Sequence, residues 1–166
     1  MALATTTVTL IIDQMITVIE DLAPAGAEVS ARTSVPFRRA PRREPLNESA
    51  KGGSTLLRRF DVVPTGVRTD PGVMDPAAVL VERELTLTMC YPDMPALYGT
   101  NEIDDMHTVA EADAIKLHDA LASPGNHASG QLAAYVTQSS LDRANDELWM
   151  LRLTVLVQFY QAQTLT

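Results

Sequence analysis

The sequence predicts an α+β fold in which two helices cover an antiparallel four-stranded sheet and a long basic loop leaves it. Two segments place hydrophobic residues at three- and four-residue steps, two others alternate hydrophobic and polar residues, and residues 32–58 show neither period. The order helix, strand, strand, helix, strand, strand is typical of helices layered on one sheet face. The 166 residues favour a single domain, 1–166, with its core in 1–31 and 59–166.

The first helix is predicted over residues 6–22. Its hydrophobic residues recur at helical spacing, while Asp13 and Glu20 mark a polar side. A threonine of the run 5–7 is expected to cap its start, and Pro24 to end it. Many β-branched residues lower its intrinsic propensity, so packing on a sheet is expected to stabilise it.

Residues 32–58 follow and form the predicted basic loop. Eight of the thirteen basic residues lie within 32–59, beside two acids, so this segment carries +6 and the rest of the chain −14. The net charge of −8 argues against a general nucleic-acid binder. A loop this long is uncommon inside a compact domain.

Two interpretations of the basic loop stay open. It is either a docking arm that pairs with acidic surface on a neighbouring subunit or with DNA phosphate, or a solvated loop without a role. The acidic remainder favours the neighbouring subunit, because copies of the chain would otherwise repel one another. The candidate interface residues are Arg38, Arg39, Arg42, Arg43, Arg58 and Arg59.

The four strands are predicted over Leu56–Val63, Val79–Tyr91, Leu132–Val136 and Leu148–Tyr160. Prolines, glycines and Asp-Pro pairs between residues 64 and 76 indicate turns. The second helix is predicted over 108–122, where Thr108 and Glu111 match a capping box.

Few residues suggest chemistry. A metal site is one interpretation of a group of acids and histidines near the second helix, but no H-E-x-x-H spacing is present, so the group indicates an acidic helix start. Its members are Asp104, Asp105, His107, Glu111 and His118. Lys51 to Thr55 lack the order of a phosphate loop. Cys90, the single cysteine, is expected to be a small core residue. We therefore expect no catalytic site, metal or cofactor, and the N-terminal residues lack the pattern of a secretion signal.

The order of elements resembles the tail terminator (tail completion) proteins of long-tailed bacteriophages and of related contractile injection machines. The resemblance rests on an N-terminal amphipathic helix, a long loop, the strand Glu82–Tyr91, the helix 108–122 and the final strand Glu147–Tyr160. It covers most of the chain except the loop. Within the final strand, the residues from Trp149 to Tyr160 carry it most clearly.

The resemblance implies a non-enzymatic virion protein of the tail and neck, made in the bacterial host cytoplasm. Family members form a six-fold ring that caps the head-proximal end of the tail tube and stops its polymerisation. The implied partners are other copies of the chain, the tail tube protein, a neck or head–tail connector protein and the sheath protein, with DNA passing through the lumen. Two alternatives stay open, another neck or connector component and a small-molecule-binding regulatory α+β domain.

Overall fold

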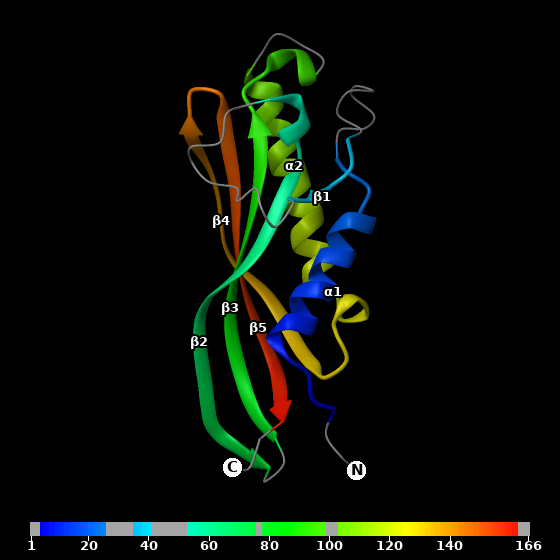
Figure 1. Ribbon diagram of the computed structural model, residues 1–166, viewed down its shortest axis with the longest axis vertical. Helices are drawn as coiled ribbons and strands as arrows, with labels where there is room; N and C mark the ends of the chain where they lie inside the picture. Colours follow the sequence, from blue (N-terminus) through cyan, green and yellow to red (C-terminus); the bar gives the residue numbers. More distant parts are fainter. Residues whose placement is uncertain (1–3, 26–34, 41–52, 76–77, 99–102, 163–166) are drawn as a thin grey trace.

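The computed structural model describes residues 4–25, 35–40, 53–75, 78–98 and 103–162, with only the backbone for 67–75 and 103–105. Two helices and five strands make up the body (Figure 1). Their bounds are α1 Val8–Asp21, β1 Arg38–Arg39, β2 Arg59–Asp75, β3 Ala78–Pro92, α2 Ile103–Ala122, β4 Gln131–Asn145 and β5 Leu148–Ala162. Three short 3-10 turns connect them, η1 Ser54–Leu56, η2 Pro95–Leu97 and η3 Pro124–Asn126.

Both predicted helices form. The side chain of Thr7 caps α1 by accepting a hydrogen bond from the Leu10 N–H at 3.3 Å, which confirms a cap from the threonine run. Helix α2 begins five residues earlier than predicted, so the proposed capping box at Thr108 is wrong. The reason is that the buried face of α2 continues towards its N-terminus through Val109 and Met106.

The sheet has the strand order β1-β2-β3-β5-β4. The α+β class is confirmed, but the prediction of four antiparallel strands is wrong, because β1 adds a fifth strand parallel to β2. Part of the predicted loop 32–58 is therefore structured: Phe37 and Leu57 are buried, and residues 38–39 pair with 59–60. Residues 32–34 and 41–52 of that segment lie outside the described part.

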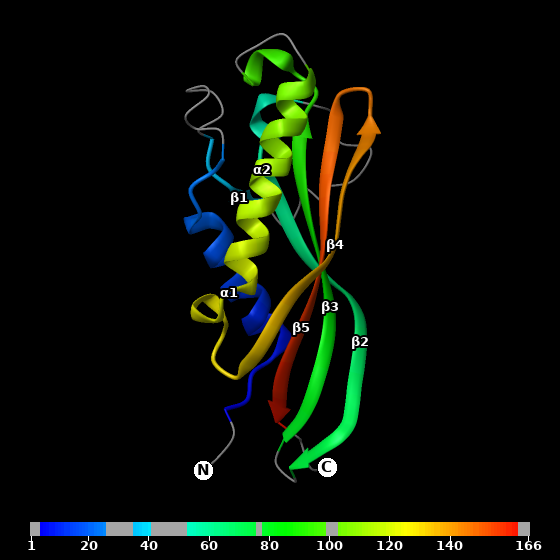
Figure 2. The ribbon, with the colours of Figure 1, turned by 180° about the vertical axis from the view of Figure 1, so that it is seen from behind.

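The chain repeats one arrangement, a helix followed by a two-stranded hairpin. Helix α1 precedes the hairpin β2–β3, helix α2 precedes β4–β5, and the two hairpins meet along β3 and β5. Leu85 pairs with Val155 midway along this junction. The hairpins point to opposite ends of the sheet, and the helices lie antiparallel on the same face (Figures 1 and 2). An approximate two-fold axis therefore passes through the centre of the sheet.

The core lies between the helices and the inner sheet face. Alternate residues of β5 from Leu151 to Phe159 are buried there, against Ile11 and Ile19 of α1 and Leu117 of α2. The intervening residues form the outer face, which carries neither α1 nor α2; at one end of it, Leu56 of η1 packs against buried Cys90, Leu148 and Met150. Its polar members include Glu82, Glu84, Thr86, Thr88, Thr154 and Gln158. Away from the Cys90–Met150 end, the sheet is therefore covered on one side, as the alternation in β3 and β5 predicts.

Candidate subunit interface

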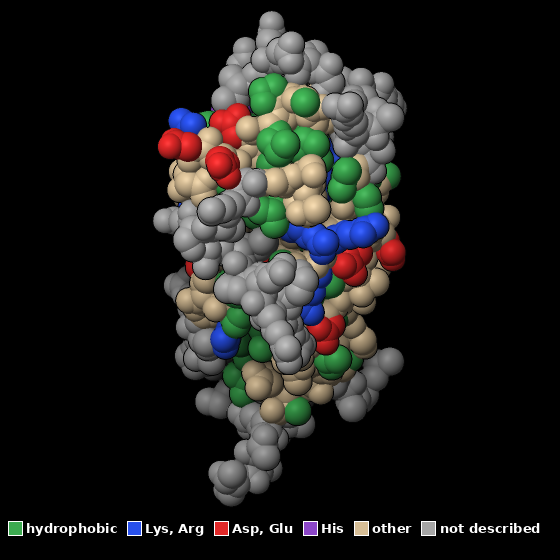
Figure 3. All heavy atoms as spheres, turned by 45° about the horizontal axis from the view of Figure 1, so that its top comes forward, with side chains coloured by type: hydrophobic (Ala, Val, Ile, Leu, Met, Phe, Trp, Pro, Cys, Tyr) green, Lys and Arg blue, Asp and Glu red, His purple; other side chains and the backbone are tan. Residues whose placement is uncertain are grey.

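Three of the six candidate arginines meet at the β1–β2 end of the sheet. Arg38 pairs with Arg59 in the ladder, and Arg39 pairs with Phe60. The Arg39 backbone N–H donates to Glu20 Oε1 at 3.0 Å, which joins β1 to the end of α1. Figure 3 shows Lys and Arg side chains gathered in a band on one face, with Asp and Glu beside them.

This basic edge is held by contacts within its own chain. Arg59 Nε donates to the Thr55 carbonyl at 3.2 Å, and its Nη1 donates to the Arg39 carbonyl at 3.4 Å. Arg39 Nε lies 3.9 Å from Asp61 Oδ1, with both side chains partly exposed, so this ion pair is weak. The edge therefore presents fixed positive charge beside the start of residues 41–52. Arg42 and Arg43 belong to those residues and lie outside the described part.

Arg58 is not a surface residue, which corrects its place among the candidates. Its side chain is fully buried, and its Nε lies 2.6 Å from Asp113 Oδ2, whose side chain is also fully buried. Tyr91 OH donates to the same oxygen at 2.8 Å, and the Ala25 N–H donates to Asp113 Oδ1 at 2.7 Å. A partner cannot reach this guanidinium, so its role is internal.

The buried pair joins segments that are distant in sequence. Arg58 Nη1 donates to the Val35 carbonyl at 3.0 Å and Nη2 to the Ala25 carbonyl, while its guanidinium lies 5.6 Å from the Phe37 ring centre. Burial raises the pKa of the Asp113 carboxyl, although the bonds it accepts act in the opposite direction. Arg58 also has a φ of 56°, in the left-handed region. The network thus joins the residues that precede β1 and β2 to helix α2.

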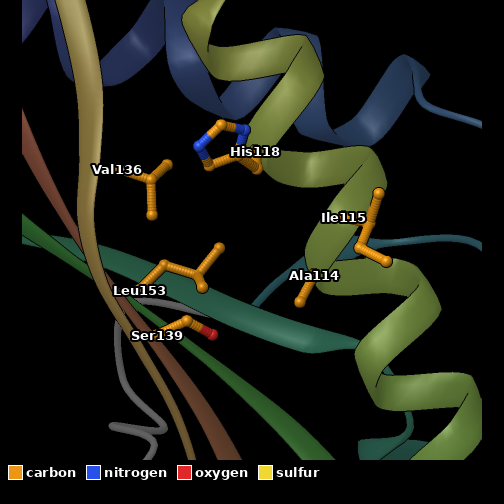
Figure 4. Close-up of a pocket in the computed structure, with 6 residues that line it drawn as sticks. All are labelled: Ala114, Ile115, His118, Val136, Ser139 and Leu153. Carbon is orange, nitrogen blue, oxygen red and sulfur yellow. The ribbon is translucent and has the colours of Figure 1, made fainter.

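A cavity between α2 and β4 was not predicted from the sequence. It has a volume of about 250 Å³, and Figure 4 shows residues of α2 facing residues of β4 and β5 across it. The lining residues are Ala114, Ile115, His118, Val136, Ser139 and Leu153. Ile115, one of these residues, is 64% exposed. In the sequence, the cavity is indicated by Ile115, which lies outside the periodic hydrophobic face of the helix.

Strand β4 forms the sheet edge beside this cavity. It pairs with β5 on one side, and on its other side no strand pairs with it in the described part of the chain. Residues 131–141 of this strand contain no Asp, Glu, Lys, Arg or Pro. Charge and proline, two of the usual protections of an edge strand, are therefore missing there, whereas register shifts at Gln131/Ala133 and Val136/Gln138 put two bulges in this strand.

The comparisons with known proteins assign no family: neither a protein-family model nor a characterised protein matches the chain. Within the described residues, no three His, Cys, Asp or Glu side chains gather into a possible metal site. No helix of the described part is long and apolar enough to cross a membrane. The two sheet edges and the α2–β4 cavity are therefore the features that bear on function.

Proposed function

We propose that this protein is a structural subunit of the tail terminator type, which assembles head to tail into a ring at the head-proximal end of a tail tube. The observation that carries the proposal is the difference between its two sheet edges. One edge, at β1 and β2, is basic and partly paired, whereas the other, β4, is uncharged along residues 131–141. Two unlike surfaces on one subunit suit heterologous contacts, which close into a ring when the rotation permits.

Charge supports the same proposal. Most of the chain is acidic, so copies repel one another except where a basic or an uncharged surface meets its neighbour. The basic edge and the following Arg42 and Arg43 can bridge to acidic surface, as the sequence analysis expects. An acidic ring also suits the passage of DNA, which would slide without binding tightly. In this proposal the ring stops tube growth and meets a neck or connector protein.

The α2–β4 cavity is the one observation that favours a regulatory small-molecule-binding domain instead. Its volume of about 250 Å³ is below the range of about 300–1,000 Å³ typical of ligand pockets. Its lining offers two polar side chains, His118 and Ser139, among aliphatic ones. A single hydrophobic side chain of a protein partner fits this chemistry better than a polar metabolite.

Electron microscopy and sedimentation of the purified full chain test the proposal. We expect rings of about six copies. Replacing Arg38, Arg39, Arg42 and Arg43 by Ser should prevent assembly, whereas replacing the same four by Lys should preserve it, because Lys keeps the charge. Arg58 is left unchanged in both variants because it is part of the core. A monomeric wild-type chain, or an unchanged oligomer with the Ser variant, would contradict the arm-bridged ring.

A further inference from the structure

We infer that the β4 edge and the adjacent α2–β4 cavity bind the β2 edge of a second copy of this chain. The inference rests on the proposed ring and names the surface at which neighbouring subunits meet. It joins three observations: an edge strand without charge or proline along residues 131–141, an apolar cavity beside it, and strand directions that suit head-to-tail pairing.

The edge strand is long enough to hold a neighbour. β4 runs for 15 residues, and one side of its backbone has no strand partner in the described part of the chain. A free edge of this kind adds an extended segment through main-chain hydrogen bonds. Because residues 131–141 are uncharged, the β2 edge of another copy can approach here without like charges facing each other.

The cavity supplies a place for a side chain of the neighbour. Val136 and Leu153 form its sheet side, and Ile115 stands exposed at its helix side (Figure 4). Filling it removes apolar surface from water, which favours association. Edge pairing provides the main-chain contacts and the cavity provides a hydrophobic anchor, the two parts of strand addition.

The chain already uses this kind of contact at its other edge. There β1 adds to β2 as a parallel strand, and the preceding Phe37 is buried in the core. Strand addition beside a helix, with a hydrophobic side chain inserted, is therefore compatible with this sheet. β1 covers only residues 59–60 of β2, so the remainder of that edge has no described strand beside it.

Strand direction and exposure point to β2 as the occupant. β2 and β4 run in opposite directions, because the strands alternate across β2-β3-β5-β4. A copy translated along the sheet therefore places its β2 antiparallel to β4. Pro64 is exposed on that part of β2 and pairs with buried Leu85, so it stands on the helix side of the sheet, as the cavity does. Val63 is 44% exposed but pairs with Thr86 of the outer face, so of these two residues Pro64 is the one that matches the cavity of the neighbour.

The test measures assembly of the full chain by sedimentation velocity and electron microscopy, with circular dichroism as the check of folding. Ile115→Asp places a charge at the cavity, and Ser139→Phe fills it from within. Both should raise the concentration needed for ring formation by about tenfold or more. Met94→Asp is the matched control, because Met94 is 40% exposed between β3 and η2, outside β2, β4 and the cavity lining, and this variant should assemble like the wild type.

Hydrogen exchange gives a second readout that needs no variant. Amides of residues 131–145 should exchange more slowly in the assembled wild-type chain than in the diluted monomer, together with those of β2. Rings whose β4 amides stay unprotected, or rings unaffected by both cavity variants, would overturn the edge contact and leave the ring proposal standing. A wild-type chain that forms only monomers or two-fold dimers would overturn the ring and this contact together.

Discussion

Removing the Asp113 carboxylate should destabilise the fold strongly while leaving the surface unchanged. Asp113→Ala takes away the partner 2.6 Å from Arg58 Nε and the acceptor of the Tyr91 hydroxyl. The Arg58 guanidinium then stays fully buried, with the carbonyls of Val35 and Ala25 as remaining acceptors. Breaking a buried pair from one side costs about 3–5 kcal/mol. For a chain of this size, that loss lowers Tm by about 6–20 °C.

Urea and thermal unfolding followed by circular dichroism measure this loss. Asp119→Ala, on the same helix with a 78% exposed side chain, is the control and should change stability by less than about 0.5 kcal/mol. In the double variant Arg58→Met/Asp113→Leu no buried charge is left, so the double-mutant cycle should give a coupling energy of about 2 kcal/mol or more. A loss below about 1 kcal/mol for Asp113→Ala would refute the reasoning.

Three smaller perturbations follow from the same structure. Burial raises the pKa of Cys90 to about 12, so roughly one thiol in ten thousand is ionised at pH 8. Thiol reagents should therefore label Cys90 only after denaturant unfolds the chain. Rapid labelling of the native protein would contradict this burial. Gly130→Ala should destabilise the fold by at least about 1 kcal/mol in urea titrations, because φ is +86° and the new Cβ would lie 2.8 Å from the Thr5 backbone. Thr7→Ala removes the α1 cap and should cost about 1 kcal/mol, whereas Thr7→Ser should cost much less.

The elements whose two faces differ in burial can be predicted from the sequence. In β3 and β5 one face packs on the helices and the other has none, so hydrophobic residues alternate and the predicted strands Val79–Tyr91 and Leu148–Tyr160 nearly match the observed ones. Helix α1 was located for the same reason, since its buried residues repeat at helical steps. Burial on one side leaves a period that a single sequence displays.

The edge strands lack that signal. Pro64 and Gly66 suggested turns, yet β2 continues through them to Asp75 because a proline on an edge strand needs no ladder partner for its missing N–H. In β4 most residues are exposed or half-buried, so little alternation marks the strand beyond the predicted Leu132–Val136. Register shifts along the β2–β3 and β4–β5 pairs further disturb a two-residue period.

The prediction of the candidate interface is wrong at Arg58, because a charged residue can be buried when it has a partner. Arg58 stands in a basic run, which favours an exposed position. Its buried partner Asp113, however, lies 55 residues further along the chain, so the run itself does not reveal the pair. One signal was available: Asp113 falls on the apolar face of its helix, three residues after Ala110 and four before Leu117. An acid at such a position needs a buried cation, although tertiary structure is needed to say which one.

The residues that flank 41–52 are held in place by backbone hydrogen bonds on both sides. On one side the Ala40 N–H bonds the Phe60 carbonyl at 2.7 Å, and on the other η1 leads into Arg58, whose N–H bonds the Cys90 carbonyl at 2.9 Å. Each doubling of the number of residues that a chain closes between two fixed ends costs only about 0.6 kcal/mol of closure entropy. Insertions or deletions between residues 40 and 53 should therefore change the stability of the body little, because the hydrogen bonds on both sides do not depend on the number of residues between them.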